Sequence, residues 1–80
     1  MSTSSLTIAT VKKNAREEVR ISLDVFNGQR LFNSRVFFEA QDGTMRPGKA
    51  GLALRLECLE AYAEAVTSAL LTAKSKGFLK

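Results

Sequence analysis

The sequence has no histidine and only one cysteine, Cys58, among its 80 residues. A single cysteine excludes an internal disulfide, and without histidine we expect neither a zinc site nor a histidine-based catalytic triad. Serines and threonines are present, but they lack a candidate general base, and no glycine lies in the strand-to-helix context of a phosphate-binding loop. The sequence therefore predicts a protein that is not an enzyme and that uses no metal and no cofactor.

Segments for export or membrane insertion are also missing from the sequence. No stretch combines the basic, apolar and small-residue regions of a secretory signal, and the longest uncharged apolar run is far shorter than a membrane span. The lack of a disulfide framework suits a reducing compartment. We therefore expect an intracellular, cytoplasmic protein with no membrane contact, nucleoid-associated if its source is bacterial.

The length allows one small domain with little room for a hydrophobic core. A core of this size rarely supplies more than about 3–5 kcal/mol without a disulfide, a metal or a partner chain. Because 45% of the residues are apolar, we expect self-association to bury further surface. We assign residues 1–17, which begin with an uncharged Ser/Thr-rich stretch, to a flexible tail, residues 18–76 to the domain and residues 77–80 to a C-terminal tail.

Positive charge is concentrated in the middle of the chain. The net charge is +4, and residues 19–55 hold six cations against three carboxylates. The cations are Arg20, Arg30, Arg35, Arg46, Lys49 and Arg55, and the carboxylates are Asp24, Glu39 and Asp42. A local excess of this kind indicates a polyanionic partner.

The middle of the chain has the pattern of an antiparallel β-sheet. Apolar and polar residues alternate over residues 18–26, and Asn27-Gly28 then predicts a type I′ hairpin turn into a second strand over residues 29–40. Asp42-Gly43 predicts a second turn of the same type, followed by a short strand at residues 44–46. Pro47-Gly48 interrupts the pairing, and residues 49–54 form the fourth strand. The pattern predicts a four-stranded antiparallel meander.

From Leu56 onward the apolar spacing becomes that of a helix. At about 100° per residue, one stripe collects seven apolar side chains: Leu59, Tyr62, Ala63, Val66, Ala69, Leu70 and Ala73. The start has no good capping residue, since Arg55 stands where Ser, Asp or Asn is preferred, whereas Gly77 suits the C-terminal end. The fold class is therefore α+β, a four-stranded antiparallel sheet followed by one C-terminal helix.

Aromatic side chains lie among the cations of the predicted sheet. Single-stranded nucleic acids are bound by cations that follow the backbone and by aromatic faces that stack on bases. We assign Phe32 to the core, but alternation places Phe26 on the opposite face from the apolar residues of its strand. One of Phe37 and Phe38 must also point away from the core if the strand is regular.

Three segments resemble the positive cofactor 4 family of transcriptional coactivators across residues 18–73. They are Val19-Arg-Ile-Ser-Leu-Asp-Val-Phe-Asn-Gly, Phe37-Phe38, and Asp42-Gly-Thr-Met-Arg-Pro-Gly-Lys-Ala-Gly-Leu-Ala-Leu54. The last contains a stretch similar to that family's Gly-x-Met-basic-Pro-Gly-basic-x-Gly-apolar signature. The resemblance implies a curved sheet, dimerisation through the helices, and binding of single-stranded DNA or melted duplex with little sequence preference, in a compact bacterial or phage-like form.

The resemblance also implies site residues. Phe26 and Phe38 match base-stacking aromatics, Arg35 matches an arginine that contacts phosphate or base, and Arg46 and Lys49 match cations that flank the proline turn. Three positions depart from the family by lacking its basic residues, namely Asn27, Gln29 and Ala50, and Arg30 is the cation expected to compensate.

Two other functions fit the same residues. Stacking platforms hardly distinguish the sugar, so single-stranded RNA is an alternative ligand. The apolar helix stripe also suits a protein-interaction module that binds a different chain. The proposed site contains one conflict, because simple alternation puts Arg35 and Phe38 on opposite faces. A β-bulge between them would bring both to one surface.

Overall fold

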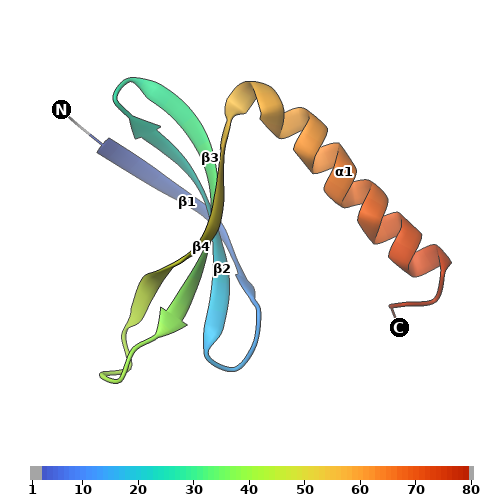
Figure 1. The fold of residues 1–80 in the computed structure, drawn as a ribbon, viewed down its shortest axis with the longest axis horizontal. Helices are drawn as coiled ribbons and strands as arrows, with labels where there is room; N and C mark the ends of the chain where they lie inside the picture. Colours follow the sequence, from blue (N-terminus) through green and yellow to red (C-terminus); the bar gives the residue numbers. More distant parts are fainter. Residues whose placement is uncertain (1–2, 80) are drawn as a thin grey trace.

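The computed structural model describes residues 3–79 as one antiparallel sheet followed by a long helix (Figure 1). The strands pair in sequence order, β1-β2-β3-β4. The elements are β1 (Thr3–Lys12), β2 (Glu17–Phe26), β3 (Gln29–Glu39), β4 (Met45–Arg55) and α1 (Leu56–Ser75). This arrangement confirms the predicted fold class.

The first strand lies where we predicted a flexible tail, so that prediction is wrong for residues 3–12. β1 pairs with β2 along its length, from Ser4 opposite Val25 to Lys12 opposite Glu18. Its threonines, isoleucine and valine favour a strand. The pairing shifts by one residue at Ile8, and this bulge breaks the alternation of apolar and polar residues by which a strand is recognised in the sequence.

The two short strands predicted at residues 44–46 and 49–54 are one continuous strand, β4. Pro47-Gly48 does not end it but lies at a register shift. Arg35 of β3 pairs with Gly51 and Phe37 pairs with Pro47. Residues 48–50 of β4 therefore lie opposite a single residue of β3, Val36. A bulge of this kind accommodates proline, which has no N–H to give to the ladder.

The two hairpin turns differ in type. Asn27 and Gly28 both have positive φ, 53° and 78°, as the predicted type I′ turn requires. In the second turn only Gly43 does, with φ 86°, and its N–H donates to the carbonyl of Ala40 at 2.9 Å. The Asp42-Gly43 turn is therefore a type I turn followed by a left-handed glycine, not the predicted type I′ turn.

The helix begins at Leu56 as predicted and has no side-chain cap at Arg55. It ends in a Schellman motif around Gly77, whose φ is 75°. The N–H of Gly77 donates to the carbonyl of Lys74, and the N–H of Phe78 donates to that of Ala73. The expected role of Gly77 at the C-terminal end is confirmed.

The sheet has an apolar face, which we define by the side of β2 that bears Val19, Ile21, Leu23 and Val25 and by their cross-strand partners. Phe32 pairs with Leu23 and with Leu54, and its ring centroid lies 6.0 Å from that of Tyr62. The helix therefore begins over this face. Phe32, 8% exposed, is the one buried hydrophobic side chain among those that the structure describes, as expected for a core residue.

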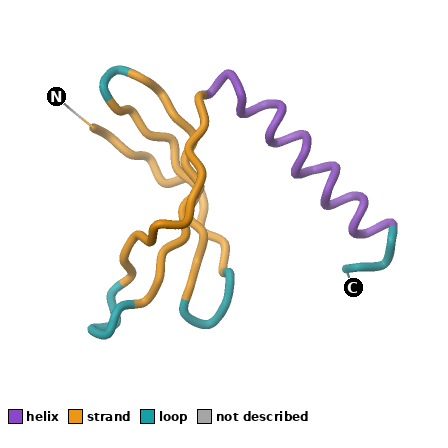
Figure 2. The backbone as a smooth tube through the Cα atoms, viewed as in Figure 1, coloured by secondary structure: helices purple, strands orange, loops and turns teal. Residues whose placement is uncertain are grey.

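Beyond its first turns the helix leaves the sheet (Figure 2). Among the described residues, its contacts with the sheet involve only β3 and β4, and Val66, Leu70 and Leu71 are exposed. The chain measures 47 × 37 × 18 Å. Its accessible surface is 6396 Å², whereas a monomer of this mass exposes about 4,800 Å². A single chain thus leaves both the helix stripe and much of the apolar face uncovered.

Candidate nucleic-acid interface

The opposite side of the sheet is a polar face, which we define by Glu18, Arg20, Ser22, Asp24 and Phe26 of β2 and their cross-strand partners. Directly opposite residues of an antiparallel pair point to the same side. The partners on β3 are Phe37, Arg35, Asn33, Leu31 and Gln29, in that order. Two arginines and two phenylalanines therefore share this face, and the helix lies on the other side.

Arg20 is held over an aromatic ring on the polar face. Its guanidinium carbon lies 4.1 Å from the centroid of the Phe37 ring, which is cation–π geometry. Its Nε also donates to the Glu18 carboxylate. The Arg20 side chain remains 35% exposed, so the guanidinium is oriented by protein groups but still meets solvent.

Arg35 lies across the β4 bulge. Its Nη1 donates to the carbonyl of Gly48 at 3.2 Å and more weakly to that of Lys49 at 3.5 Å. Gly51, its partner on β4, leaves the room for this path, because a Cβ there would lie 3.1 Å from the Arg35 Cζ. The bulge and the glycine thus orient a guanidinium along the sheet surface.

Asp24 joins three strands in the middle of the polar face. Its carboxylate accepts hydrogen bonds from Ser5 of β1, Ser22 of β2 and Asn33 of β3, at 2.7 to 3.0 Å. Burial alone would raise the pKa of Asp24, but these hydrogen bonds and the charge of Arg35 outweigh burial and lower the pKa. Asp24 is therefore a structural anion that is already satisfied.

A third cation, Arg46, lies beside the β3–β4 turn. Arg46 Nη2 contacts the Asp42 carboxylate at 3.0 Å, and Asp42 also accepts hydrogen bonds from the hydroxyl and N–H of Thr44. The bonds from Thr44, followed by that from Arg46, lower the pKa of Asp42. Phe38 and Arg46 line an open pocket of about 560 Å³ beside this turn.

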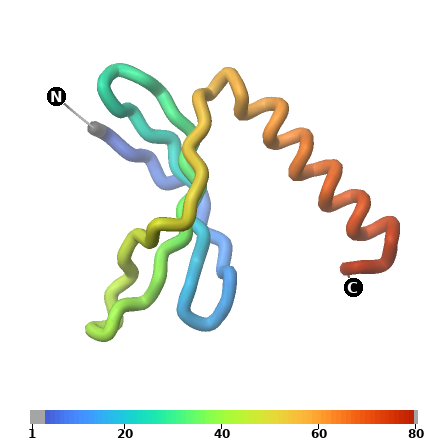
Figure 3. The backbone as a smooth tube through the Cα atoms, viewed as in Figure 1, coloured from blue at the N-terminus to red at the C-terminus, as the bar shows by residue number. Residues whose placement is uncertain are grey.

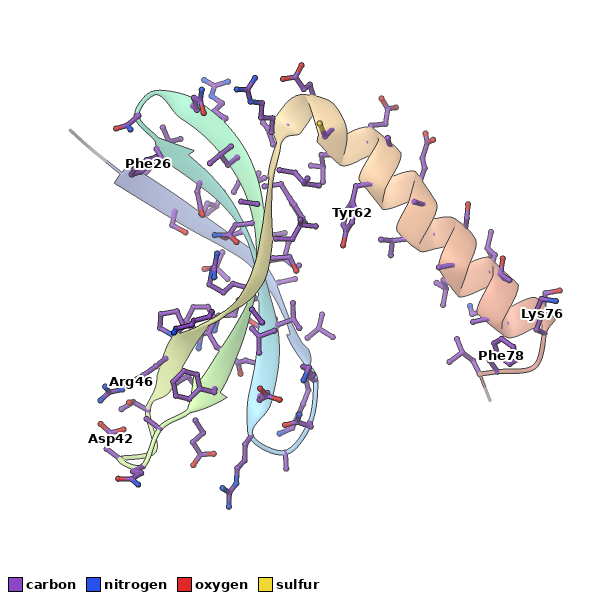
Figure 4. All side chains as sticks on the ribbon, in the orientation of Figure 1. Phe26, Asp42, Arg46, Tyr62, Lys76 and Phe78 are labelled. Atoms are coloured by element: carbon purple, nitrogen blue, oxygen red, sulfur yellow. The ribbon has the colours of Figure 1, made fainter. Side chains whose placement is uncertain are left out.

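The six predicted site residues do not form one patch in a single chain. Phe26, 53% exposed, lies on the polar face at the β2–β3 hairpin, and Arg30 follows that hairpin on the apolar face, opposite Val25. Phe38, 40% exposed, lies at the other end of β3, opposite Arg46. The other two are Arg35, in mid-strand, and Lys49, exposed in the β4 bulge. Figure 4 shows Phe26 and Arg46 at opposite ends of the sheet.

The suggested bulge between Arg35 and Phe38 is not present in β3. The register of β2 and β3 runs without a shift from Glu17 opposite Phe38 to Phe26 opposite Gln29. The irregularity lies on β4 instead, so Arg35 and Phe38 stay on opposite faces. In the view of Figure 3 the strands overlap near mid-sheet and point in different directions toward both ends, as a strong twist produces.

Sequence reasoning did not select Arg20 or Phe37 for the site. Alternation along the strands could have indicated both residues. In β2 it places Arg20 on the face opposite the apolar side chains, and in β3 it places Phe37 on the same face as Arg35. Their contact with each other needed the register, which depends on the hairpin turn.

Residues 3–79 contain no group of three or more His, Cys, Asp or Glu side chains that could hold a metal ion. Within the same range, the helix is not long and apolar enough to cross a membrane.

The comparisons with known proteins agree with this architecture. The family model described as Transcriptional Coactivator p15 (PC4) matches residues 13–65. No curated protein matches the chain. Among solved structures, a PC4 homolog from Burkholderia pseudomallei K96243 is 33% identical with a TM-score of 0.69. In its orthorhombic crystal form the match covers 88% of this chain and 90% of that one.

A more distant relative has the same fold. It is the bacteriophage T5 homolog of the eukaryotic coactivator PC4, with a TM-score of 0.63 at 15% identity over 91% of this chain and 82% of that one. The family model covers more than half of the sequence, and the bacterial homolog exceeds 30% identity over most of it. The chain therefore belongs to the transcriptional coactivator p15 (PC4) family.

Proposed function

We propose that this protein is a homodimer that binds single-stranded DNA with little sequence preference and supports transcription, replication or repair. The observation that carries the proposal is that one sheet bears exposed aromatic rings and guanidinium groups, and that the helix covers little of this sheet. Family membership supports it, and the phage T5 homolog is described as implicated in recombination-dependent DNA replication.

The proposed contacts follow the chemistry of each side chain. Phe26 and Phe38 stack on bases, since they are 53% and 40% exposed and every base offers a π-face. The cations Arg30, Arg35, Arg46 and Lys49 neutralise phosphates. Neither kind of contact reads base edges, so the binding tolerates different sequences.

Dimerisation is proposed from the surface that one chain leaves uncovered. The accessible area exceeds that of a typical monomer by about a third, and a standard interface buries about 800 Å² of each partner. Pairing of the α1 stripes would cover Val66 and Leu70, and would bring a second sheet beside the first. The six site residues lie on two faces and at two ends of one sheet. A second sheet is therefore needed to form a continuous path for one DNA strand.

Competition between nucleic acids tests the proposal. A fluorescently labelled oligo-dT is bound first, and unlabelled DNA single strands, RNA single strands and DNA duplex of equal length are then added. We expect single-stranded DNA of any base composition to displace the probe and duplex to do so poorly. Preferential displacement by RNA would favour the alternative ligand, and no binding of oligo-dT at low salt would overturn the proposal.

A further inference from the structure

Two arginines lie directly opposite each other near the middle of the polar face. Arg20 of β2 and Arg35 of β3 are cross-strand partners, a placement in which like charges destabilise a sheet. Each is held in place by other groups: Arg20 by Glu18 and the Phe37 ring, and Arg35 by backbone carbonyls of the β4 bulge. An anion between the two guanidinium groups would relieve their repulsion.

The surroundings of the pair leave it accessible. Along the same row of the sheet, the neighbour of Arg20 is Thr10 and that of Arg35 is Gly51. Both are small, so neither side of the pair is walled by a bulky side chain. A chain of phosphodiesters can therefore approach the two guanidinium groups from above the sheet.

The contact with Phe37 gives Arg20 a second property. The Arg20 guanidinium lies over the Phe37 ring, with its carbon 4.1 Å from the ring centroid. About a third of the Arg20 side chain stays exposed. Unpaired bases stack on guanidinium planes as well as on aromatic rings. Phe37, Arg20 and a base would then form one continuous stack.

We infer that Arg20, backed by Phe37, is a further nucleic-acid contact of this protein, stacking on one base while it shares a phosphate with Arg35. The inference rests on the proposed binding of single-stranded DNA and adds a contact in mid-sheet on the polar face, which also bears Phe26 at the β2–β3 hairpin.

Three substitutions separate the two parts of the contact. Arg20→Lys keeps the charge and loses the plane, Arg20→Gln loses both, and Phe37→Leu removes the backing ring. Arg16→Lys and Arg16→Gln are the matched controls, because Arg16 is an exposed arginine in the turn between β1 and β2. Each protein is titrated against labelled oligo-dT and against a backbone-only oligomer of equal length in which abasic residues replace the nucleotides.

We expect Arg20→Lys and Phe37→Leu to weaken oligo-dT binding at least about fivefold, the lower bound for one stacked base, and to change abasic binding little. Arg20→Gln should weaken binding to both and lower the salt slope by about 0.7 per protomer. The Arg16 controls should leave the oligo-dT preference unchanged. Circular dichroism verifies folding, and Arg20→Lys decides the matter if Phe37→Leu does not fold.

The outcomes distinguish this inference from the proposed function. If wild type binds oligo-dT and the Arg20 variants match their Arg16 controls, the inference is wrong and the proposed function stands. If wild type fails to bind oligo-dT, the proposed function is wrong and the inference falls with it.

Discussion

Asp24 shows how one residue can organise a sheet that has almost no core. The carboxylate accepts hydrogen bonds from side chains of β1, β2 and β3, so it connects three strands on the face away from the helix. A hydrogen bond to a charged group contributes about 1.5–3 kcal/mol to the free energy of unfolding, more than a hydrogen bond between neutral groups. Because Phe32 is the one buried hydrophobic side chain among the described residues, we expect this network to contribute measurably to the stability.

Replacing Asp24 by asparagine should therefore destabilise the fold by about 1–3 kcal/mol, because the neutral amide accepts weaker hydrogen bonds and presents a donor to Ser5 or Asn33. Urea unfolding followed by circular dichroism measures the change. Glu60→Gln, a charge loss on the exposed side of α1, is the control and should be nearly neutral. Equal effects of the two substitutions would contradict the structural role of Asp24.

Three carboxylates with lowered pKa values predict how the stability of the fold depends on pH. Hydrogen bonds from Lys13 and Asn14 lower the pKa of Glu17, and the pKa values of Asp24 and Asp42 are lowered as well. The unfolded chain then binds protons before the folded one as pH falls, so stability present at neutral pH is lost. Thermal unfolding should give a constant Tm from about pH 7 to 5 and a falling Tm below about pH 4.5. A Tm that rises on acidification would contradict these shifts.

At the scale of elements, the β4 bulge determines where Arg35 points. Gly51 allows the close approach of the two strands, because an added Cβ would meet the Ser34 carbonyl oxygen at 3.0 Å and the Arg35 Cα at 3.2 Å. Both are backbone atoms, so the strands would have to move apart. The glycine thus connects the local geometry of β4 to a cation of the proposed site.

Gly51→Ala should weaken binding to oligo-dT and destabilise the fold by about 1–3 kcal/mol, the usual range for overpacking. Gly28→Ala is the control: its left-handed φ of 78° makes alanine unfavourable by about 1–2 kcal/mol, but nothing lies within 4 Å of the added Cβ. We expect both variants to lose stability and only Gly51→Ala to lose affinity when folded. Equal affinity of the two folded variants would show that Arg35 does not depend on the bulge.

The elements that could be predicted from sequence are those with a strong local signal. β2 alternates without interruption, Asn27-Gly28 specifies its turn, and α1 combines a helical stripe with a C-terminal glycine. β1 lacked such a signal because its bulge disrupts the alternation, and Pro47-Gly48 resembled a chain break although β4 passes through it. The faces of Phe38 and Arg46 depend on register between strands, which no single segment encodes.

For the whole molecule, the surface left open by one chain predicts a dimer. Light scattering coupled to size exclusion at micromolar concentration should report twice the chain mass of 8.8 kDa. A monomer under these conditions would contradict the proposed architecture, because a radius of gyration of 14.9 Å is large against about 12 Å for a compact domain of this length.

Val66→Asp tests which surface forms that dimer. In a single chain Val66 is 51% exposed, so a carboxylate there would be harmless, whereas within a helix–helix interface it would be an unpaired buried charge. We expect the variant to dissociate or unfold, and Ser68→Asp, on the opposite side of α1, to remain a stable dimer. Dimerisation of both variants would place the interface elsewhere.

Salt dependence of oligo-dT binding tests most directly whether this sheet binds single-stranded DNA through phosphates and stacked bases. Fluorescence anisotropy over a salt series should give a linear log–log plot for wild type, with a slope of about −0.7 per phosphate contact. Arg46→Ala should make that slope shallower. Phe38→Ala should weaken the binding free energy by about 1–3 kcal/mol per stacked base. It should leave the slope nearly unchanged, since stacking releases no counterions. Salt-independent binding by wild type, or folded dimers of both variants that bind as tightly as wild type, would contradict the account.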